Sequence, residues 1–257
     1  MVKPATLHPE IVRRYIFQLS AQVVIQELKS FGNSTRISDL ARFYKTGPGE
    51  YAEGDVFLGA TVPQTRTVAK KFKNLDFIEI EKLFNSPFHE VRLCAAIILN
   101  LQFQGTKNQQ DRKRIFDFYL KQVRAERVNN WDLVDVSAPW MGVYLREVED
   151  PMPLLLKLSK SKSLWQRRVS IILTFALIRA GDLEPTFTIA EALLQDDQDL
   201  IHKAVGWMLR ELGKRDVMLL RNFLTENASV MPRTMLRYAI EKLPEGERKK
   251  WLVESKY

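Results

Sequence analysis

The sequence predicts an all-helical protein, an α-solenoid of HEAT-like helix-pair repeats whose concave face is basic. Three observations favour this fold class. Apolar residues recur at helical spacing along almost the whole 257-residue chain. Runs of alternating polarity bounded by hairpin turns are missing. A short pattern, a basic residue followed by a mostly apolar stretch, returns several times along the chain.

The predicted helices follow one another with polar or Gly/Pro-containing breaks between them, such as SFGNS, QGTK and LPEGE. We expect N-terminal helices within residues 1–44, a Gly-rich loop within 45–62 and the main repeat array over 63–257. The loop contains KTGPGEYAEGD, residues 45–55. Because no low-complexity segment or long linker divides these parts, the sequence predicts a single domain over 1–257.

The repeats define the architecture. Residues 91–99, 167–175 and 202–209 each place a basic residue before a mostly apolar helix. Arg168 and Lys203 are spaced like one HEAT-type helix pair, and Arg92 and Arg168 like two. Repeats of roughly 40 residues stack into a superhelix with one concave face. Short amphipathic helices of an ordinary bundle could produce the same pattern, and that alternative stays open at this stage.

Composition limits the classes of function. The single cysteine, Cys94, excludes a disulfide framework and a zinc site built on several thiolates, and its apolar surroundings predict a buried structural thiol. The first residues have no apolar core typical of a signal peptide, and no apolar stretch approaches membrane-spanning length. We expect a cytoplasmic protein. The net charge of +8 favours nucleic acid as a partner, ahead of an anionic membrane surface.

The repeats give some basic residues a common position. Arg92, Arg168, Lys203 and Arg233 lie near the starts of successive inner helices, where they would form a cationic track along the concave surface. Helix N-termini also favour anions, and duplex phosphates would complement such a track. Alternatively, each of these side chains caps a neighbouring carbonyl or pairs with an acidic residue of an adjacent repeat.

The segment NNWDLVD, residues 129–135, suggests chemistry. Trp131 and Asp135 are four residues apart and therefore share one face of a helix. A carboxylate in a basic cleft would repel DNA unless it had a local task. In the alternative interpretation, Asp132 or Asp135 caps the helix and Trp131 anchors the core.

Two further segments favour the first interpretation. Trp165 lies beside Arg167 and Arg168, and Trp207 lies one helical turn after Lys203. Tryptophans next to charged groups at equivalent points of successive repeats suggest one aromatic-lined pocket on the concave surface.

At these residues the sequence resembles the AlkD family of DNA alkylation repair glycosylases. The resemblance rests on WDLVD, WQRR, IHKAVGWMLRE and FLGATVPQTR, which keep the family's order and nearly its spacing over residues 57–243. It implies that Trp131 is the active-site tryptophan, Asp135 the catalytic aspartate and Arg168 the phosphate-holding arginine. Trp207 would be a second cleft tryptophan. The sequence departs from the family at Asn130, where a further tryptophan is expected, and in the longer 45–55 loop.

The resemblance also implies a reaction. Purines alkylated at N3 or N7 are cationic and leave as neutral bases, so hydrolysis needs a placed carboxylate more than a strong acid. We expect a monofunctional glycosylase that removes 7-methylguanine and 3-methyladenine from duplex DNA in base excision repair, with the base left stacked. Arg167 and Arg210 are expected to bind DNA together with the cationic track.

The same interpretation predicts a monomer of the bacterial cytosol or nucleoid, with no cofactor, metal or membrane partner. The histidines His8, His89 and His202 lack ligand-spaced partners. Two alternatives remain: a non-catalytic HEAT-like protein that binds branched or distorted DNA, and a protein-binding HEAT scaffold. The basic charge disfavours the scaffold.

Overall fold

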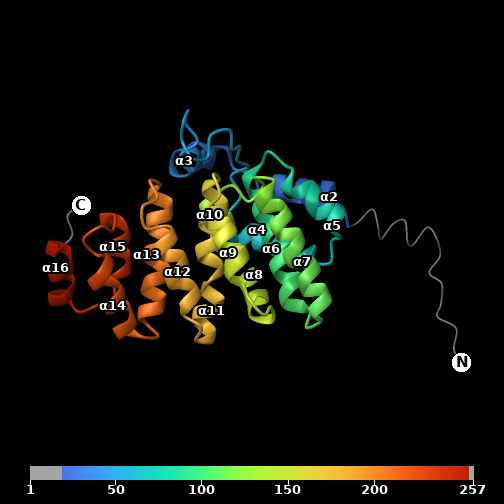
Figure 1. The fold of residues 1–257 in the computed structure, drawn as a ribbon. Helices are drawn as coiled ribbons and strands as arrows, with labels where there is room; N and C mark the ends of the chain where they lie inside the picture. The colour runs from blue at the N-terminus through green and yellow to red at the C-terminus, as the bar shows by residue number, and fades with distance from the viewer. Residues whose placement is uncertain (1–18, 255–257) are drawn as a thin grey trace, which may run out of the picture. The chain divides into compact units, whose positions relative to one another are not determined.

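The computed structural model describes residues 19–254, and all regular secondary structure in that range is helical apart from one isolated parallel bridge between Val56 and Phe88 (Figure 1). The predicted all-helical fold is confirmed. The chain forms two compact units, Met1–Gly105 and Thr106–Tyr257. Residues 1–18, which include His8 and part of the predicted N-terminal helices, lie outside the described residues.

The first unit contains α2 (Ala21–Ser30), α3 (Ser34–Phe43), α4 (Val62–Lys71), α5 (Phe77–Phe84) and α6 (His89–Gly105). Helices α2, α4 and α5 pack on α6. Side-chain caps set where several of them begin: the Ser20 hydroxyl caps α2, the Asp76 carboxylate caps α5, and Thr61 forms a reciprocal capping box with Gln64 on α4. Helix α6 is buried over most of its circumference, with Cys94 fully enclosed as expected.

The FLGA segment after the Gly-rich loop is bound to the first turn of α6. The Glu90 carboxylate accepts hydrogen bonds from the backbone N–H groups of Leu58 and Gly59, at 2.9 and 2.8 Å. Gly59 has a φ of +87°, and an added Cβ would lie 2.2 Å from the carbonyl oxygen of Asn33. Only glycine fits this position. The segment therefore holds the α2–α3 connection against α6.

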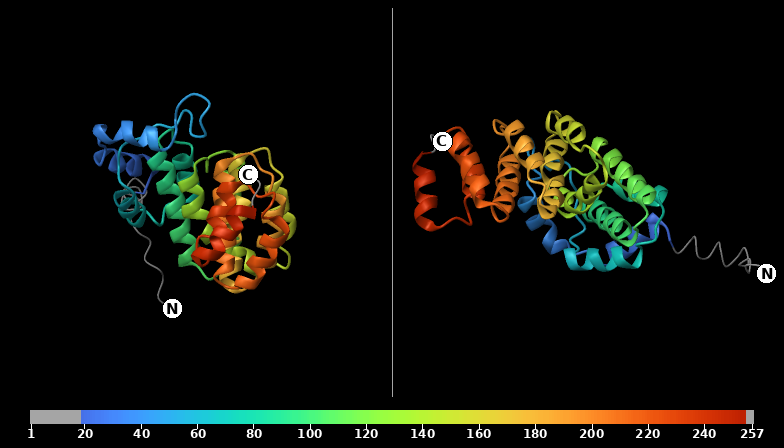
Figure 2. Two further views of the ribbon diagram at one scale, coloured as in Figure 1. Left: turned by 90° about the vertical axis from the view of Figure 1, so that its left-hand side faces the viewer. Right: turned by 60° about the horizontal axis from the view of Figure 1, so that its bottom comes forward.

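The second unit stacks helix pairs side by side, as Figures 1 and 2 show from α7 to α16. Its helices are α7 (Gln109–Arg124), α8 (Trp131–Met141), the 3₁₀ helix η1 (Gly142–Glu147), α9 (Met152–Ser159), α10 (Leu164–Leu173), α11 (Phe175–Ala180), α12 (Glu184–Ala192), α13 (Asp199–Gly213), α14 (Val217–Asn227), α15 (Arg233–Ala239) and α16 (Glu245–Glu254).

Helices α8, α10, α13 and α15, hereafter the α8 layer, pack on one another in that order. Helices α9 and α12 pack together as well, against α10 and α13, and α14 packs on α13. The approach of α13 to α15 is close, because an added Cβ on Gly206 would lie 2.4 Å from the carbonyl oxygen of Met235. The layer brings the starts of its helices, 33 to 35 residues apart in sequence, into one row.

Candidate active site

Helix α8 carries the predicted tryptophan and aspartate at its start. The side-chain oxygen of Asn130 accepts a hydrogen bond from the Trp131 N–H at 2.8 Å, and Asn130 is completely buried. Asparagine is among the preferred N-cap residues. Asn130 therefore begins the helix where the resemblance led us to expect a further tryptophan. Trp131, Asp132 and Asp135 follow on the half-buried face of α8.

Asp135 and Arg168 form a two-pronged ion pair between adjacent helices of the α8 layer. Nη2 of Arg168 lies 2.8 and 2.9 Å from the two carboxylate oxygens of Asp135, and Nε lies 3.0 Å from Oδ1. Nη1 donates to the carbonyl of Leu200 at the start of α13. The Arg168 side chain is 5% exposed and that of Asp135 is 23% exposed. The carboxylate thus stays open to solvent while its partner is enclosed.

The electrostatics of Asp135 follow from this arrangement. Burial raises the pKa of the Asp135 carboxyl above its ordinary value, although the charge and hydrogen bonds of Arg168 act in the opposite direction. The carboxylate of Asp132 adds to the rise. Asp135 is therefore a carboxylate in a partly dry environment whose ionisation depends on one guanidinium. That combination is frequent in catalytic groups and also occurs in structural ion pairs.

The aromatic side chains near the pair differ in exposure. Trp131 and Trp207 are half-buried, and the Trp207 ring packs on Phe175 with centroids 6.0 Å apart. Trp165 is only 6% exposed and belongs to the core. The expectation that Trp165 lines a pocket is therefore wrong. Helix α10 buries nearly its whole circumference, so the spacing of Trp165 beside the arginines did not reveal which face it occupies.

Three of the cations expected to bind DNA lie in local ion pairs within the second unit. Arg167 pairs with Asp196 at 2.5 Å and donates to the carbonyls of Ser161 and Lys162. Lys203 pairs with Asp199 at 2.7 Å and keeps 41% of its side chain exposed. Arg210 contacts Glu211 and Glu241.

The two remaining cations lie in different units. Arg233 is exposed at the start of α15 and donates to the carbonyl of Leu252 at 3.0 Å. Arg92 belongs to the first unit, where it is 4% exposed, pairs with Asp55 at 2.5 Å and donates to the carbonyls of Ser86 and Pro87. The DNA contacts of these five cations stay predictions.

Sequence reasoning missed two aromatic residues of the α8 layer and its surroundings. Phe175 supports the Trp207 ring from the start of α11, and Trp140 is 42% exposed on α8. Helical spacing did not point to Trp140, because nine residues at 3.6 residues per turn place it on the side of α8 opposite Trp131. Phe175 could not be found from the sequence either, because it lies 32 residues from Trp207 and their contact depends on packing.

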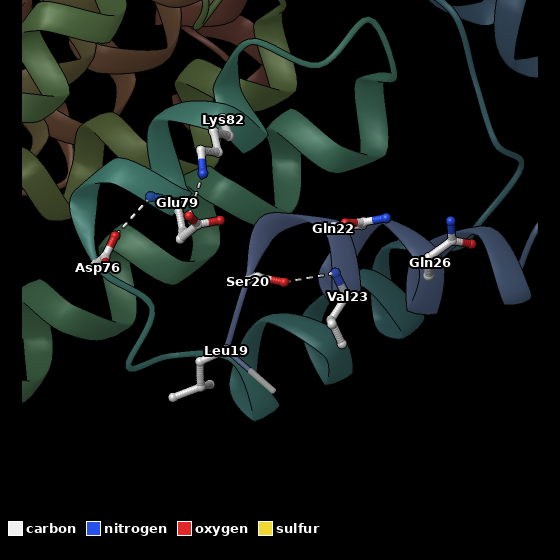
Figure 3. Close-up of a pocket in the computed structure, with 8 residues that line it drawn as sticks. All are labelled: Leu19, Ser20, Gln22, Val23, Gln26, Asp76, Glu79 and Lys82. Carbon is white, nitrogen blue, oxygen red and sulfur yellow. Dashed lines mark hydrogen bonds and ion pairs between the residues drawn. The ribbon is translucent and has the colours of Figure 1, made fainter. Parts of the chain in front are cut away.

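A cavity of about 640 Å³ lies in the first unit between the start of α2 and α5, but its carboxylates are already engaged (Figure 3). The Asp76 carboxylate accepts from the Glu79 N–H, and Glu79 pairs with Lys82 at 2.5 Å. The structure places no catalytic candidate there. Within residues 19–254, no group of three or more His, Cys, Asp or Glu residues could hold a metal ion, and none of the helices could cross a membrane.

Comparisons with known proteins identify a family and a similar fold. The model of the DNA alkylation repair enzyme family matches residues 24–243, which contain the whole α8 layer. A predicted DNA alkylation repair enzyme from Enterococcus faecalis is similar in structure, with a TM-score of 0.65 and 16% sequence identity over 83% of this chain and 97% of that one. No curated protein sequence matches significantly. This chain belongs to the DNA alkylation repair enzyme family.

Proposed function

We propose that the protein is an AlkD-type, monofunctional DNA glycosylase that hydrolyses the N-glycosidic bond of cationic alkylated purines in duplex DNA. The observation that carries the proposal is the Asp135 carboxylate, oriented by Arg168 at 2.8–3.0 Å and partly exposed on the half-buried face it shares with Trp131. Membership of the family supports a role in DNA repair. The substrates would be 7-methylguanine, 3-methyladenine and related N3 and N7 adducts.

The carboxylate suits this reaction. When the C1′–N bond of a cationic purine breaks, its electron pair passes to the base, which leaves neutral, and positive charge develops on the sugar. A fixed carboxylate opposes that charge and orients a water molecule, whose oxygen bonds to C1′ while its proton passes to solvent or to Asp135. The faces of Trp131 and Trp207 would pack against the sugar and attract its cationic character.

In this proposal Arg168 acts through Asp135 by keeping its carboxylate ionised and oriented. Its guanidinium lowers the pKa of the carboxyl that burial raises, and so favours the ionised form that the reaction needs. The two-pronged contact also fixes the plane of the carboxylate. Arg168 is thus a positioning residue, and a phosphate contact by the same side chain, which the resemblance implies, stays a prediction.

Selectivity would come from the lability of the charged lesion, with the base left stacked in the duplex. A glycosylase that works in this way removes 7-methylguanine from methylated duplex DNA and leaves uracil in place. Free purine released from methylated duplex DNA is the test, with uracil-containing duplex as the control. Efficient uracil excision would contradict this account of selectivity. We expect a monomer that acts in the bacterial cytosol or nucleoid.

One observation favours a second candidate, a non-catalytic protein that binds branched or distorted DNA. Both oxygens of Asp135 already accept hydrogen bonds from Arg168, as they would in a purely structural ion pair. The same assay separates the two functions. Tight binding to a four-way junction without any release of purine from methylated duplex would favour the binder.

A further inference from the structure

A second basic site lies at the C-terminal end of the α8 layer, away from Asp135. A cavity of about 310 Å³ between α15 and α16 is bordered by three arginines, Arg233, Arg237 and Arg248, together with Tyr238. The other lining groups are Ile240, Leu252 and the Glu241 carboxylate. Three arginine side chains around one opening form a cationic surface, which attracts anions.

Two of these arginines are available to a ligand. Arg237 and Arg248 are exposed, and neither forms an ion pair with any residue between 19 and 254. Arg233 lies one turn before Arg237 on the same face of α15, and its contact with the carbonyl of Leu252 holds it at the rim. Glu241 offsets little of this charge, because it pairs with Arg210 and, at 3.1 Å, with Lys242.

The type of anion follows from the shape of the site and from its place in the layer. Arginines bind phosphate oxygens through paired N–H groups, and the Tyr238 side chain, 37% exposed, adds a hydroxyl that can donate to the same oxygens. Adjacent helices pack roughly 8–10 Å apart, so the site lies on the order of 25–30 Å from Asp135, three helices along the layer. One duplex covers that span in about eight base pairs.

We propose that Arg237 and Arg248, with Arg233 and Tyr238, bind a backbone phosphate of duplex DNA that flanks the lesion. The inference rests on the proposed function for the identity of its ligand. It adds a contact that anchors the duplex at the last helix pair and takes no part in breaking the glycosidic bond.

The test measures binding of an undamaged 24-base-pair duplex by fluorescence anisotropy at several salt concentrations. The double variant Arg237→Gln/Arg248→Gln should bind about 3- to 10-fold more weakly near physiological salt. Its slope of log K against log salt should be shallower by about 1–2, because two phosphate contacts are removed. The matched control, Arg114→Gln/Arg124→Gln, removes the same charge from exposed positions of α7 and should change the slope much less.

Two results would overturn the inference: a slope equal to that of the parent, or equal losses in both double variants, which would show that net charge alone matters. Both pairs of side chains are exposed, and thermal unfolding checks that each variant folds. If the protein bound duplex through this site but released no purine, the proposed glycosylase activity would be contradicted. The inferred phosphate site at Arg237 and Arg248 would still be supported.

Discussion

Two arginine–aspartate pairs, one in each unit, show how the same sequence pattern produces two different environments. Arg92 and Arg168 each lie early in a mostly buried helix, α6 or α10, and each pairs with an aspartate that precedes it in the chain. In the first unit both side chains are 5% exposed. In the second, the aspartate Asp135 is 23% exposed.

The difference lies in where the aspartate comes from. Asp55 belongs to the end of the Gly-rich loop and is enclosed by the first turn of α6, where His89 also contacts it at 3.4 Å. Asp135 comes from a helix whose half-buried face also carries Trp131. The Asp55 carboxylate is enclosed by its neighbours, whereas the Asp135 carboxylate keeps one side open. We infer that the first pair stabilises the fold and that the second carries the chemistry.

The largest effect on stability is expected at the enclosed pair. Asp55→Asn removes the carboxylate that compensates a buried guanidinium, which should lower the free energy of unfolding by about 3–5 kcal/mol. The rate of base release per folded molecule should stay close to that of the parent. Chemical denaturation and single-turnover kinetics measure the two quantities. A stable but inactive Asp55→Asn protein would reverse the roles of the two pairs.

A smaller loss is expected where the FLGA segment crosses the first unit. Gly59→Ala places a Cβ against the carbonyl oxygen of Asn33 and requires an alanine at a φ of +87°. The clash and the backbone strain should cost about 2–3 kcal/mol. Gly49→Ala has a similar φ of +77° without any atom within 4 Å, so it isolates the cost of the backbone conformation. Equal melting temperatures for the two variants would show that the close approach to Asn33 is unimportant.

A shift in pH dependence is expected at the open pair. The reaction needs the ionised form of Asp135, so activity is present above the pKa of its carboxyl and is lost as the pH falls through it. Because burial raises that pKa, the loss should begin at a higher pH than for an ordinary aspartate. Arg168→Gln removes the group that lowers the pKa of the Asp135 carboxyl, so the loss of activity at acid pH should begin at a higher pH than in the parent. If activity were lost over the same pH range in Arg168→Gln as in the parent, Arg168 would not control the ionisation of Asp135.

Much of the fold could be predicted from local pattern. Helical spacing of apolar residues identified an all-helical chain, and the interval of four placed Trp131 and Asp135 on one face of α8. These features depend on neighbours within a turn or two, which the sequence displays directly.

Tertiary contacts were harder to predict. Asp135 and Arg168 are 33 residues apart, and only the packing of α8 on α10 brings them within 2.8 Å. The sequence supported the idea that arginines of the repeats pair with acidic neighbours, but it did not say which partner each one takes. Trp165 was misplaced for a related reason: a helix buried on nearly every side has no polar face to mark its orientation.

The most direct test compares Asp135→Asn and Asp55→Asn in one single-turnover assay of purine release from methylated duplex DNA, with rates corrected for the folded fraction. We predict that Asp135→Asn releases base at least about 100-fold more slowly than the parent while it binds the duplex as well. Asp55→Asn should keep the parental rate. If Asp135→Asn released purine as fast as the parent, Asp135 would not be the catalytic carboxylate.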